Sequence, residues 1–270
     1  MPITFDGRDF AAKKEETLKG RVFGLKSRGV HPKLASIIIG SDPASKLYVG
    51  LKKKAAERIG AELDIYFIPA NVKLADIIVL IGSLNTDDTI QGAMIQMPLP
   101  ANLAESREKL VNLINPEKDV DGLQEDSQFV HPTSKAAIDI LHEAENQKDV
   151  KAILSNISPK VVVIGATGMV GKPLVDELRT QKYEVIECDS KTKDLKSETL
   201  KGDIVISATG IKGLIKGDMV KENAVLIDVG SPCADFSPVA QDKSVFFTPV
   251  PGGVGPVTIT CLLENLVSAC

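Results

Sequence analysis

Residues 159–173, with the sequence PKVVVIGATGMVGKP, constrain the fold of this chain more than any other stretch. Residues 160–164 form a β-branched run between a proline and a glycine, which is typical of a strand buried on both faces. Gly165, Gly168 and Gly171 then recur at every third position, before apolar residues with helical spacing. Glycine permits a tight turn and a close approach to phosphate, and the following helix offers free N–H groups. The stretch therefore predicts a dinucleotide-binding strand, turn and helix.

This turn departs from the GxGxxG pattern, because Ala166 stands at the first glycine position. A glycine-rich turn alone is a weak signal, since any tight connection from strand to helix can use glycine. A second strand is expected at residues 185–187, and Asp189 follows it about 20 residues beyond Gly168. An acidic residue there can accept a hydrogen bond from the adenosine ribose. Together these features favour a nucleotide-binding fold.

The composition is that of a globular protein without a nucleic-acid surface. Of the 270 residues, 43% are hydrophobic and 25% are charged, and the formal net charge is −4. Aromatic residues are few (4%) and tryptophan is absent, which argues against base-stacking platforms. No apolar run approaches the roughly 20 residues of a membrane span, and no apolar signal segment follows Met1. We therefore expect a cytoplasmic protein that binds neither nucleic acid nor membrane.

The cysteines and histidines show no metal-ligand spacing. The cysteines (Cys188, Cys233, Cys261 and Cys270) contain no CxxC pair, and the histidines (His31, His131 and His142) form no HExxH motif. Reduced thiols and no metal site are the expectation.

Strands and helices alternate along the chain, which predicts an α/β fold with a mainly parallel sheet. The expected strands are residues 33–39, 63–68, 92–96, 160–164, 185–187, 203–207, 224–229 and 245–247. The expected helices are residues 9–28, 44–59, 72–84, 102–114, 134–145 and 257–269, together with one that follows the glycine-rich turn. Residues 117–132 are expected to form a loop between the two halves, and a short polar stretch precedes Pro159.

Parallel α/β sheets bind ligands beyond the carboxyl ends of their strands, and four segments place polar groups there. They are the helix turn with Tyr48 and Lys52, the strand end at Gln96, the PEKDVDG segment with Asp121, and the proline-glycine turn 249–256. Each segment also has a purely structural explanation. Tyr48 and Lys52 fit a helix shoulder with a solvated lysine, Asp119 and Asp121 fit a turn before Gly122, and the last turn fits a rigid connection.

These four segments occur as motifs in a recognisable order and spacing: Tyr48-x-x-x-Lys52, Gln96-Met97-Pro98-Leu99-Pro100, PEKDVDG at 116–122 and PVPGGVGP at 249–256. Over nearly its full length the chain resembles the bifunctional methylenetetrahydrofolate dehydrogenase/methenyltetrahydrofolate cyclohydrolase family. The resemblance implies an enzyme of one-carbon metabolism. Such an enzyme oxidises 5,10-methylenetetrahydrofolate with NAD or NADP and hydrolyses the methenyl product to 10-formyltetrahydrofolate.

The resemblance also implies roles for single residues. Lys52 would be the key catalytic group, Gln96 would support it by hydrogen bonding, and Asp121 would hold the pterin ring, while Tyr48 packs on the folate rings. The substrate-binding residues would be Tyr48, Lys52, Ile95, Gln96, Met97, Asp121, Pro251, Gly252, Gly253, Val254 and Gly255. We expect the cofactor-binding residues to be Gly165, Ala166, Thr167, Gly168, Val170, Gly171, Asp189, Ser190, Thr209, Gly210 and Ser231.

The fold that the resemblance implies is two α/β domains around a cleft, with the C-terminal helix returning to the first domain. Residues 1–132 plus 257–270 would form the folate-binding catalytic domain. Residues 133–256 would form a Rossmann-like, doubly wound parallel sheet that binds the dinucleotide. Members of the family are usually homodimers through the nucleotide domain.

The expected chemistry explains why a lysine and an amide would stand together. An ordinary lysine, with a pKa of about 10.4, is a poor base at neutral pH. Burial against folate and a cationic substrate would both favour the neutral form of Lys52. Gln96 is uncharged, so it can orient Lys52 without holding it as an ammonium.

The cofactor turn differs from the family pattern in two places. The family commonly has GRSxxVG, where this chain has Ala166 and Thr167 in place of Arg-Ser, and its next strand usually ends in His-Ser, where this chain has Asp189 and Ser190. Losing a cation and gaining a carboxylate near the 2′-phosphate of NADP could cost ~4 kcal/mol at close range, which favours NAD. Lys191 and Lys193 would weaken that preference.

A third departure is the loop after Gly122. The family usually has a longer segment that ends in Pro-Cys-Thr-Pro, whereas this chain has residues 123–130 and then His131-Pro132-Thr133-Ser134. The altered loop leaves open a dehydrogenase with weak or absent cyclohydrolase activity, against which Lys52 argues. A non-catalytic folate- or nucleotide-binding relative is a further alternative, against which the filled catalytic positions argue.

Overall fold

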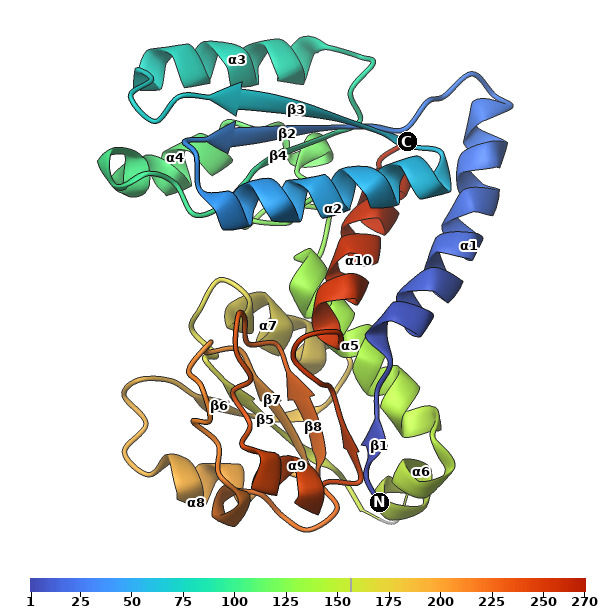
Figure 1. The fold of residues 1–270 in the computed structure, drawn as a ribbon, viewed down its shortest axis with the longest axis vertical. Helices are drawn as coiled ribbons and strands as arrows, with labels where there is room; N and C mark the ends of the chain where they lie inside the picture. Colours follow the sequence, from blue (N-terminus) through green and yellow to red (C-terminus); the bar gives the residue numbers. More distant parts are fainter. Residues whose placement is uncertain (156) are drawn as a thin grey trace. The chain divides into compact units, whose positions relative to one another are not determined.

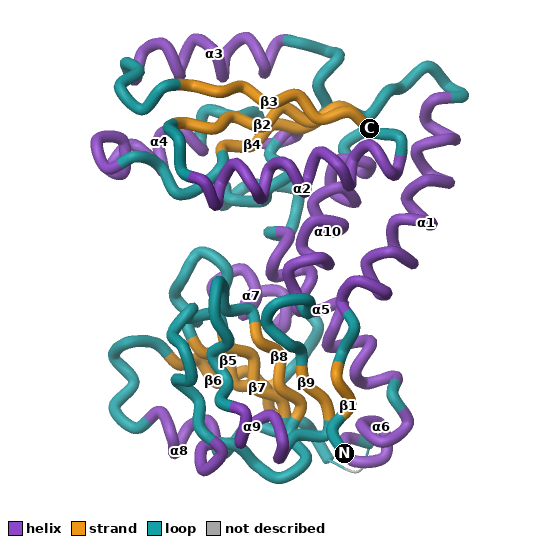
Figure 2. The backbone as a smooth tube through the Cα atoms, viewed as in Figure 1, coloured by secondary structure: helices purple, strands orange, loops and turns teal. Residues whose placement is uncertain are grey.

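The computed structural model describes residues 1–155 and 157–270, and the chain divides into two compact units (Figures 1 and 2). Unit 1 comprises Met1–Ala11 and Thr133–Thr258, and unit 2 comprises Ala12–Pro132 and Ile259–Cys270. Each unit contains a parallel β-sheet flanked by helices. The predicted α/β class with two domains is confirmed.

Unit 2 is built on a three-stranded parallel sheet in the order β3-β2-β4, formed by Glu62–Ile68, Lys33–Ile39 and Gly92–Ile95. Helices α2 (Pro43–Ile59) and α3 (Leu74–Thr86) lie on opposite sides of this sheet (Figure 1). Successive side chains of a strand point to opposite faces. Leu34 and Ile38 of β2 therefore join the cluster under α2, and Ile37 joins the cluster under α3.

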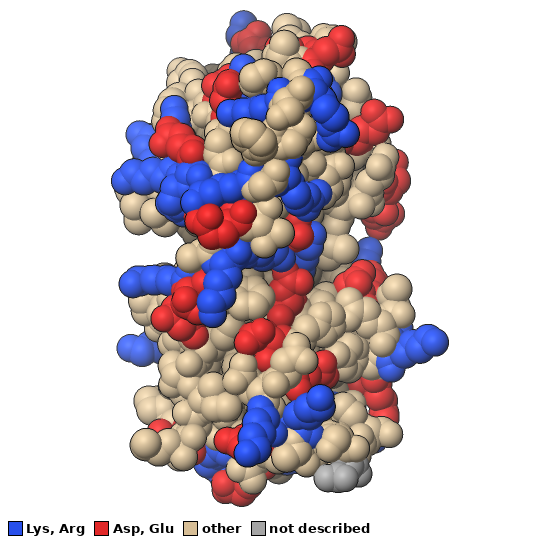
Figure 3. Space-filling model, turned by 90° about the vertical axis from the view of Figure 1, so that its right-hand side faces the viewer, with Lys and Arg blue, Asp and Glu red and all other residues tan. Residues whose placement is uncertain are grey.

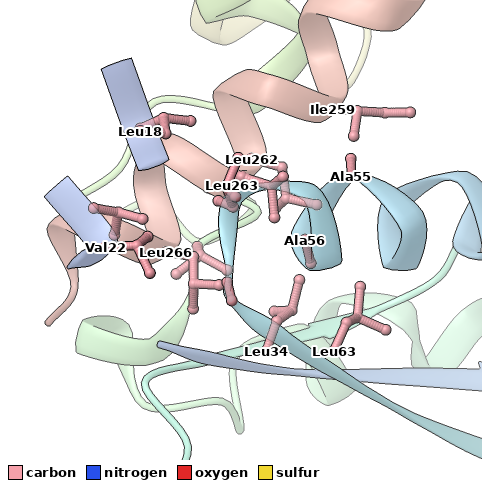
Figure 4. Close-up of a cluster of buried hydrophobic side chains, with 14 of the residues drawn as sticks. Leu18, Val22, Leu34, Ala55, Ala56, Leu63, Ile259, Leu262, Leu263 and Leu266 are labelled. Atoms are coloured by element: carbon pink, nitrogen blue, oxygen red, sulfur yellow. The ribbon is translucent and has the colours of Figure 1, made fainter. Parts of the chain in front are cut away.

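The C-terminal helix α10 (Val254–Ser268) completes the core of unit 2 from Ile259 onward (Figure 4). Its Leu262, Leu263 and Leu266 pack with Leu34 of β2 and with Ala55 and Ala56 of α2. Helix α1 (Gly7–Lys26) contributes Leu18 and Val22 to the same cluster. The last residues of the chain thus belong to a core whose other members lie some 200 residues earlier.

Unit 1 is built on a six-stranded parallel sheet in the order β1-β9-β8-β7-β5-β6. The strands, taken in that order, are Ile3–Thr4, Phe246–Phe247, Val225–Asp228, Ile204–Ser207, Lys160–Ile164 and Glu184–Cys188. Helix α7 (Gly171–Thr180) connects β5 to β6, after which the chain crosses to β7 on the other side of β5. This reversal beside β5 is the switch point of a doubly wound sheet, where such folds bind nucleotides.

The N-terminal segment differs from the expected domain division. Met1–Ala11 lies in unit 1, because β1 adds a strand to the edge of that sheet. Ile3 donates to the carbonyl of Val245 (2.8 Å) and Phe5 donates to that of Phe247 (2.9 Å). A strand of two residues has no periodicity that a sequence pattern could reveal.

The helix expected at residues 102–114 is the other main difference. It forms a 3-10 helix, η1 (Ala101–Ser106), followed by the short α-helix α4 (Arg107–Val111). The Asn85 side chain donates to the Leu113 carbonyl and accepts from the Asn115 amide, so it replaces the helical hydrogen bonds beyond α4. The amphipathic pattern of the segment thus identified buried positions but not a continuous helix.

Several short elements carried no sequence signal. Helix α6 (Lys148–Leu154) lies in the stretch expected to be merely polar, and buries Val150 and Leu154. The other short elements are η2 (Pro116–Lys118), α8 (Leu195–Thr199), η3 (Gly217–Met219) and α9 (Pro238–Lys243). Helix α5 (Pro132–Asn146) begins two residues before its expected start, and α10 begins three residues before its own. The eight predicted strands are confirmed within one or two residues at each end.

The distribution of charged side chains and the length and composition of the described helices agree with what the sequence composition predicts. Over the face drawn in Figure 3, Lys and Arg side chains lie among Asp and Glu side chains, in keeping with the formal net charge of −4. Among the described helices we find none with the length and apolar composition that a bilayer-spanning helix requires.

Gly171 should be intolerant of any side chain. A Cβ added there would lie 2.0 Å from the Gly165 carbonyl oxygen, and rigid backbone must shift to admit it. We expect Gly171→Ala to lower the free energy of unfolding by about 1–3 kcal/mol in urea denaturation, as overpacking does. The control is Gly24→Ala in α1, where an added Cβ meets no described atom outside its helix within 4 Å. That variant should gain roughly 0.5–1 kcal/mol, and equal losses in both variants would contradict this account.

Candidate active site

Helix α2 presents Tyr48 and Lys52 on adjacent turns. Its start is set by Asp42, whose carboxylate accepts the Ser45 amide (2.7 Å), and by Pro43 as the first helical residue. Lys52 is buried, with 4% of its surface exposed. Its Nζ donates to Gln96 Oε1 (3.0 Å) and lies 5.3 Å from the centre of the Tyr48 ring. The purely structural explanation of this pair required a solvated lysine, and the burial of Lys52 excludes it.

Strand β4 supplies the partners of this amine from one of its faces. Met94 Sδ lies 3.5 Å from Lys52 Nζ, and Gln96 follows two residues later on the same side. The Gln96 amide group donates to the Met97 carbonyl (2.8 Å), which leaves its oxygen turned to Lys52. Ile95, between them, packs instead in the cluster under α3. Sequence reasoning named Ile95 and missed Met94, although the alternation of strand residues about Gln96 could have found it.

The electrostatic setting of Lys52 favours its neutral form. Burial lowers the pKa of Lys52 below its ordinary value, and the Asp121 carboxylate partly opposes this. Burial likewise raises the pKa of the Tyr48 hydroxyl, with a further contribution from Asp121. The charge of Asp121 therefore acts on both side chains of α2, whereas the direct partner of the amine is an uncharged amide.

The segment with Asp121 is held by buried polar groups on both sides. The Asp119 carboxylate accepts the amides of Leu123 and Gln124 (3.0 Å each), and burial raises the pKa of Asp119 to about 6. Gly122 has a φ of +61°, and a Cβ there would lie 2.5 Å from the Phe129 carbonyl oxygen. Asp119 is thus the turn former of this segment, whereas the charge of Asp121 acts on the amine.

Asn265 of α10 joins this segment to the altered loop. Its Nδ2 donates to the carbonyls of Val120 (2.9 Å) and Val130 (3.0 Å), the residues directly before Asp121 and His131. Neither contact was foreseen, because the residues lie 145 and 135 positions apart.

His131 is a second ionisable group near the amine. It is buried (6% exposed), and burial lowers the pKa of its imidazole. Asp121 raises that pKa, whereas the charges of Lys52 and Arg107 lower it further. The sequence marked His131 only as part of a departure from the family loop, and that departure is the signal that could have singled it out.

In unit 1 the glycine-rich turn is a tight connection between β5 and α7. Gly165 has a φ of +81°, and the amides of Gly165 and Ala166 both donate to the Cys188 carbonyl at the end of β6 (2.9 and 3.0 Å). The close approach of Gly171 to Gly165 brings the start of α7 onto the strand. Thr167 and Gly168 are exposed at this helix start, and Val170 is half-buried. These residues fit a dinucleotide, since the glycines let the turn pack closely against backbone and the start of α7 offers free N–H groups.

The other expected cofactor residues lie at the same edge of this sheet, because all its strands are parallel. Asp189 follows β6, where its carboxylate accepts the Lys191 amide (2.8 Å) and its own amide donates to Thr192 Oγ1 (2.9 Å). Ser190 is exposed beside it. Thr209 and Gly210 follow β7, and Ser231 follows β8.

The proline-glycine turn belongs to unit 1, whereas Tyr48, Lys52, Gln96 and Asp121 belong to unit 2. Gly252 accepts the Gly7 amide (3.1 Å), and the Gly253 amide donates to the Pro249 carbonyl (2.8 Å). Val254 and Gly255, expected in the turn, are the first two residues of α10. Pro251 is exposed, and Met97 of unit 2 is half-buried.

Two family models together match most of the chain. The catalytic domain of tetrahydrofolate dehydrogenase/cyclohydrolase matches residues 5–121, and the NAD(P)-binding domain of the same family matches residues 132–270. The chain belongs to this family. The expectation drawn from the sequence motifs is thereby confirmed, as are an enzyme of folate one-carbon chemistry and a nicotinamide dinucleotide as its cofactor.

Relatives and solved structures agree over the full length. The bifunctional protein FolD of Lactobacillus helveticus is 39% identical over 283 residues, covering 99% of this chain and 97% of the relative. The FolD methylenetetrahydrofolate dehydrogenase/cyclohydrolase of Campylobacter jejuni superposes with a TM-score of 0.90 at 33% identity, covering 100% of this chain and 98% of that one. The Trypanosoma brucei family member, solved with NADP and an inhibitor, has a TM-score of 0.88 at 30% identity, covering 99% and 97%.

Asn265 should matter to folate binding as well as to stability. Asn265→Ala leaves the buried carbonyls of Val120 and Val130 without this donor, which should lower the free energy of unfolding by about 1–3 kcal/mol. It should also raise the KM for the folate substrate, because the segment with Asp121 loses the hydrogen bond from Asn265 to the Val120 carbonyl. The control is Ser268→Ala in the same helix, which removes two exposed bonds, one donated to the Glu264 carbonyl and one accepted from Arg21. Loss of stability with an unchanged folate KM would show that Asn265 serves the core alone.

Proposed function

We propose that this chain oxidises 5,10-methylenetetrahydrofolate to 5,10-methenyltetrahydrofolate with NAD(P)+ and hydrolyses the product to 10-formyltetrahydrofolate. The observation that carries this proposal is the buried amine of Lys52, which has a neutral amide as its partner and a carboxylate nearby. Both halves of the family match the chain, and the FolD relatives are named as bifunctional.

In the oxidation the protein mainly positions two ligands. NAD(P)+, when bound, supplies the hydride acceptor. Asp121 would accept N–H groups of the pterin, and the Tyr48 ring would stack on it. The turn 165–171 and the residues after β6, β7 and β8 would hold the dinucleotide, with its pyrophosphate at the start of α7. The folate site would also include Ile95, Met97 and the backbone of residues 251–255.

In the hydrolysis Lys52 would act as the base. The neutral amine takes one proton from water as the water oxygen bonds to the methenyl carbon. The bond from that carbon to N5 then breaks as the second water proton moves to N5, and the formyl group stays on N10. The proton on Lys52 returns to solvent. The lowered pKa of Lys52 fits this role, because an ordinary lysine would hold its proton at neutral pH.

Replacing the amine should slow the hydrolysis. Lys52→Met should reduce hydrolysis of 5,10-methenyltetrahydrofolate by ~10²–10⁴-fold, the usual contribution of general acid–base catalysis. The assay follows loss of the methenyl absorbance with purified protein. Lys53→Met, at an exposed neighbour on the same helix, is the matched control and should hydrolyse at the parent rate. A Lys52→Met variant as fast as its parent would refute the role of this amine.

We extend the proposal to the choice of cofactor: the enzyme prefers NAD to NADP. Asp189 stands at the end of β6, and the turn has Ala166 and Thr167 where a cation would meet the 2′-phosphate. The carboxylate would bind the ribose hydroxyl of NAD and repel the phosphate of NADP.

We expect a higher kcat/KM with NAD than with NADP, and we expect Asp189→Asn to shift the ratio toward NADP by ~10-fold through loss of charge repulsion. The amide oxygen of the variant can still accept the Lys191 amide. Asp194→Asn removes the same charge from the N-cap of α8 and should leave the ratio unchanged. A parent enzyme that prefers NADP would overturn this assignment.

We further propose a cytoplasmic homodimer that associates through the nucleotide domain, residues 133–256. The family resemblance supports this proposal. A monomer mass in light scattering would contradict it.

A further inference from the structure

Two buried aspartates lie beneath the loops that would bind the dinucleotide in unit 1. Asp228 is the last residue of β8, and Asp235 follows seven residues later; they are 1% and 0% exposed. Strands β7 and β8 are parallel neighbours, so the loops leaving their carboxyl ends are adjacent. These loops carry Thr209 and Ser231, which the proposed function assigns to the cofactor.

Asp235 holds the loop after β7. Its Oδ2 accepts three hydrogen bonds: from Ser207 Oγ (2.7 Å), from the Thr209 amide (2.8 Å) and from Thr209 Oγ1 (2.8 Å). Thr209 Oγ1 in turn accepts the Ile211 amide (3.2 Å). One carboxylate oxygen therefore orders both the backbone and the side chain of Thr209.

Asp228 holds the loop after β8. Its Oδ1 accepts the Gly230 amide (2.9 Å), and its Oδ2 accepts the amides of Asp235 (2.8 Å) and Phe236 (3.2 Å). Residues 229–235 are thus tied at both ends to one side chain. The Asp228 amide itself donates to Thr248 Oγ1 on the neighbouring chain segment (2.7 Å).

The two carboxyl groups meet at Gly230. The position that a Cβ of Gly230 would occupy lies 2.4 Å from Asp235 Oδ1 and 2.9 Å from Asp228 Oδ1. Within the described part of the chain, Asp235 Oδ1 is buried and has no hydrogen-bond partner. Two buried carboxylates this close repel each other strongly when both are charged.

We propose that Asp228 and Asp235 share one proton, and that this pair positions Thr209 and residues 229–235 for the dinucleotide. The positioning role rests on the proposed function, whereas the shared proton does not. A proton between the two Oδ1 atoms supplies the donor that Asp235 Oδ1 lacks, while both Oδ2 atoms keep their bonds to the loops. Asp228 and Asp235 are positioning residues in this scheme, because they act on the cofactor through the loops.

The protonation of Asp228 agrees with its surroundings. Burial raises the pKa of Asp228 to about 7, and the Asp235 charge adds to that effect. The other groups bonded to Asp228 are the Thr248 hydroxyl and backbone amides, which do not titrate in this range. The folded pKa lies above the unfolded value of about 4, so this pair favours the folded state at low pH. The contribution is lost as the pH rises through about 7.

The shared proton is tested on the protein without cofactor. The parent should show the infrared carbonyl band of a protonated carboxyl at pH 6, and its free energy of unfolding should fall between about pH 4 and 7. Asp235→Asn removes the neighbouring charge, and its amide nitrogen can donate to Asp228 Oδ1. The variant should show a weaker band at pH 6 and move that fall to lower pH. Asp119, with a pKa of about 6, contributes equally in both proteins, so the difference between them is decisive. An identical band in parent and variant would overturn the shared proton.

The positioning role is tested by equilibrium binding of NAD and NADP in a calorimeter, without turnover. Asp235→Ala removes the acceptor of Thr209 and should weaken the better cofactor at least ~10-fold, the loss of about one buried hydrogen bond. Thr209→Val keeps the shape of the side chain but removes the hydroxyl that donates to Asp235, and it should also weaken cofactor binding. This variant takes the place of Asp235→Ala if Asp235→Ala does not fold. The control is Asp203→Asn at the opposite end of β7, where Asp203 accepts the Lys160 amide (3.0 Å).

Parental affinity in both test variants would overturn the positioning role. A parent protein that binds neither NAD nor NADP would instead overturn the proposed function, and the infrared result would stand apart from it.

Discussion

The chemistry of unit 2 depends on a lysine amine that is buried beside an amide. Burying an ammonium is costly unless a charged partner compensates for the lost water. At Lys52 the direct oxygen partner is Gln96 Oε1, which accepts a hydrogen bond but does not hold the positive charge as a carboxylate would. Asp121 acts from farther away and opposes only part of the effect of burial. The amine therefore loses its proton more readily than an ordinary lysine, and the fold must keep the helix and strand that carry it tightly packed.

Both units support their ligand residues in the same physical way. The residues meant to touch ligands lie just beyond parallel strands, and buried polar groups beneath them satisfy the loop backbone. Asp119 and Asn265 do this for the segment with Asp121, and Asp228 and Asp235 do it for the loops with Thr209 and Ser231. Hydrogen bonds to these fixed side chains therefore order the loop backbone.

The strands and the candidate site were predictable to different extents. Buried parallel strands such as 33–39 (KLASIII) and 160–164 (KVVVI) are mostly apolar runs that include β-branched residues, so their positions follow from the local sequence. The start of α2 follows from Asp42 and Pro43. Strand β1 and helix α6 were missed, because elements of two and seven residues are too short to show a clear periodic pattern. The family motifs located Lys52, Gln96 and Asp121, and the alternation of strand residues about Gln96 could have located Met94, but no pattern pointed to Asn265 or Asp235.

Local chemistry is what the sequence by itself determined: the alternation of strands and helices, the glycine turn, the helix caps and the order of the family motifs. Only the tertiary structure decided which polar groups are buried together and therefore which of them can change their charge. Asn265 reaches Val120 across 145 positions, and Asp235 reaches Ser207 across 28. Burial and electrostatic coupling arise from such contacts between distant parts of the chain, and these contacts cannot be predicted from periodicity along the chain.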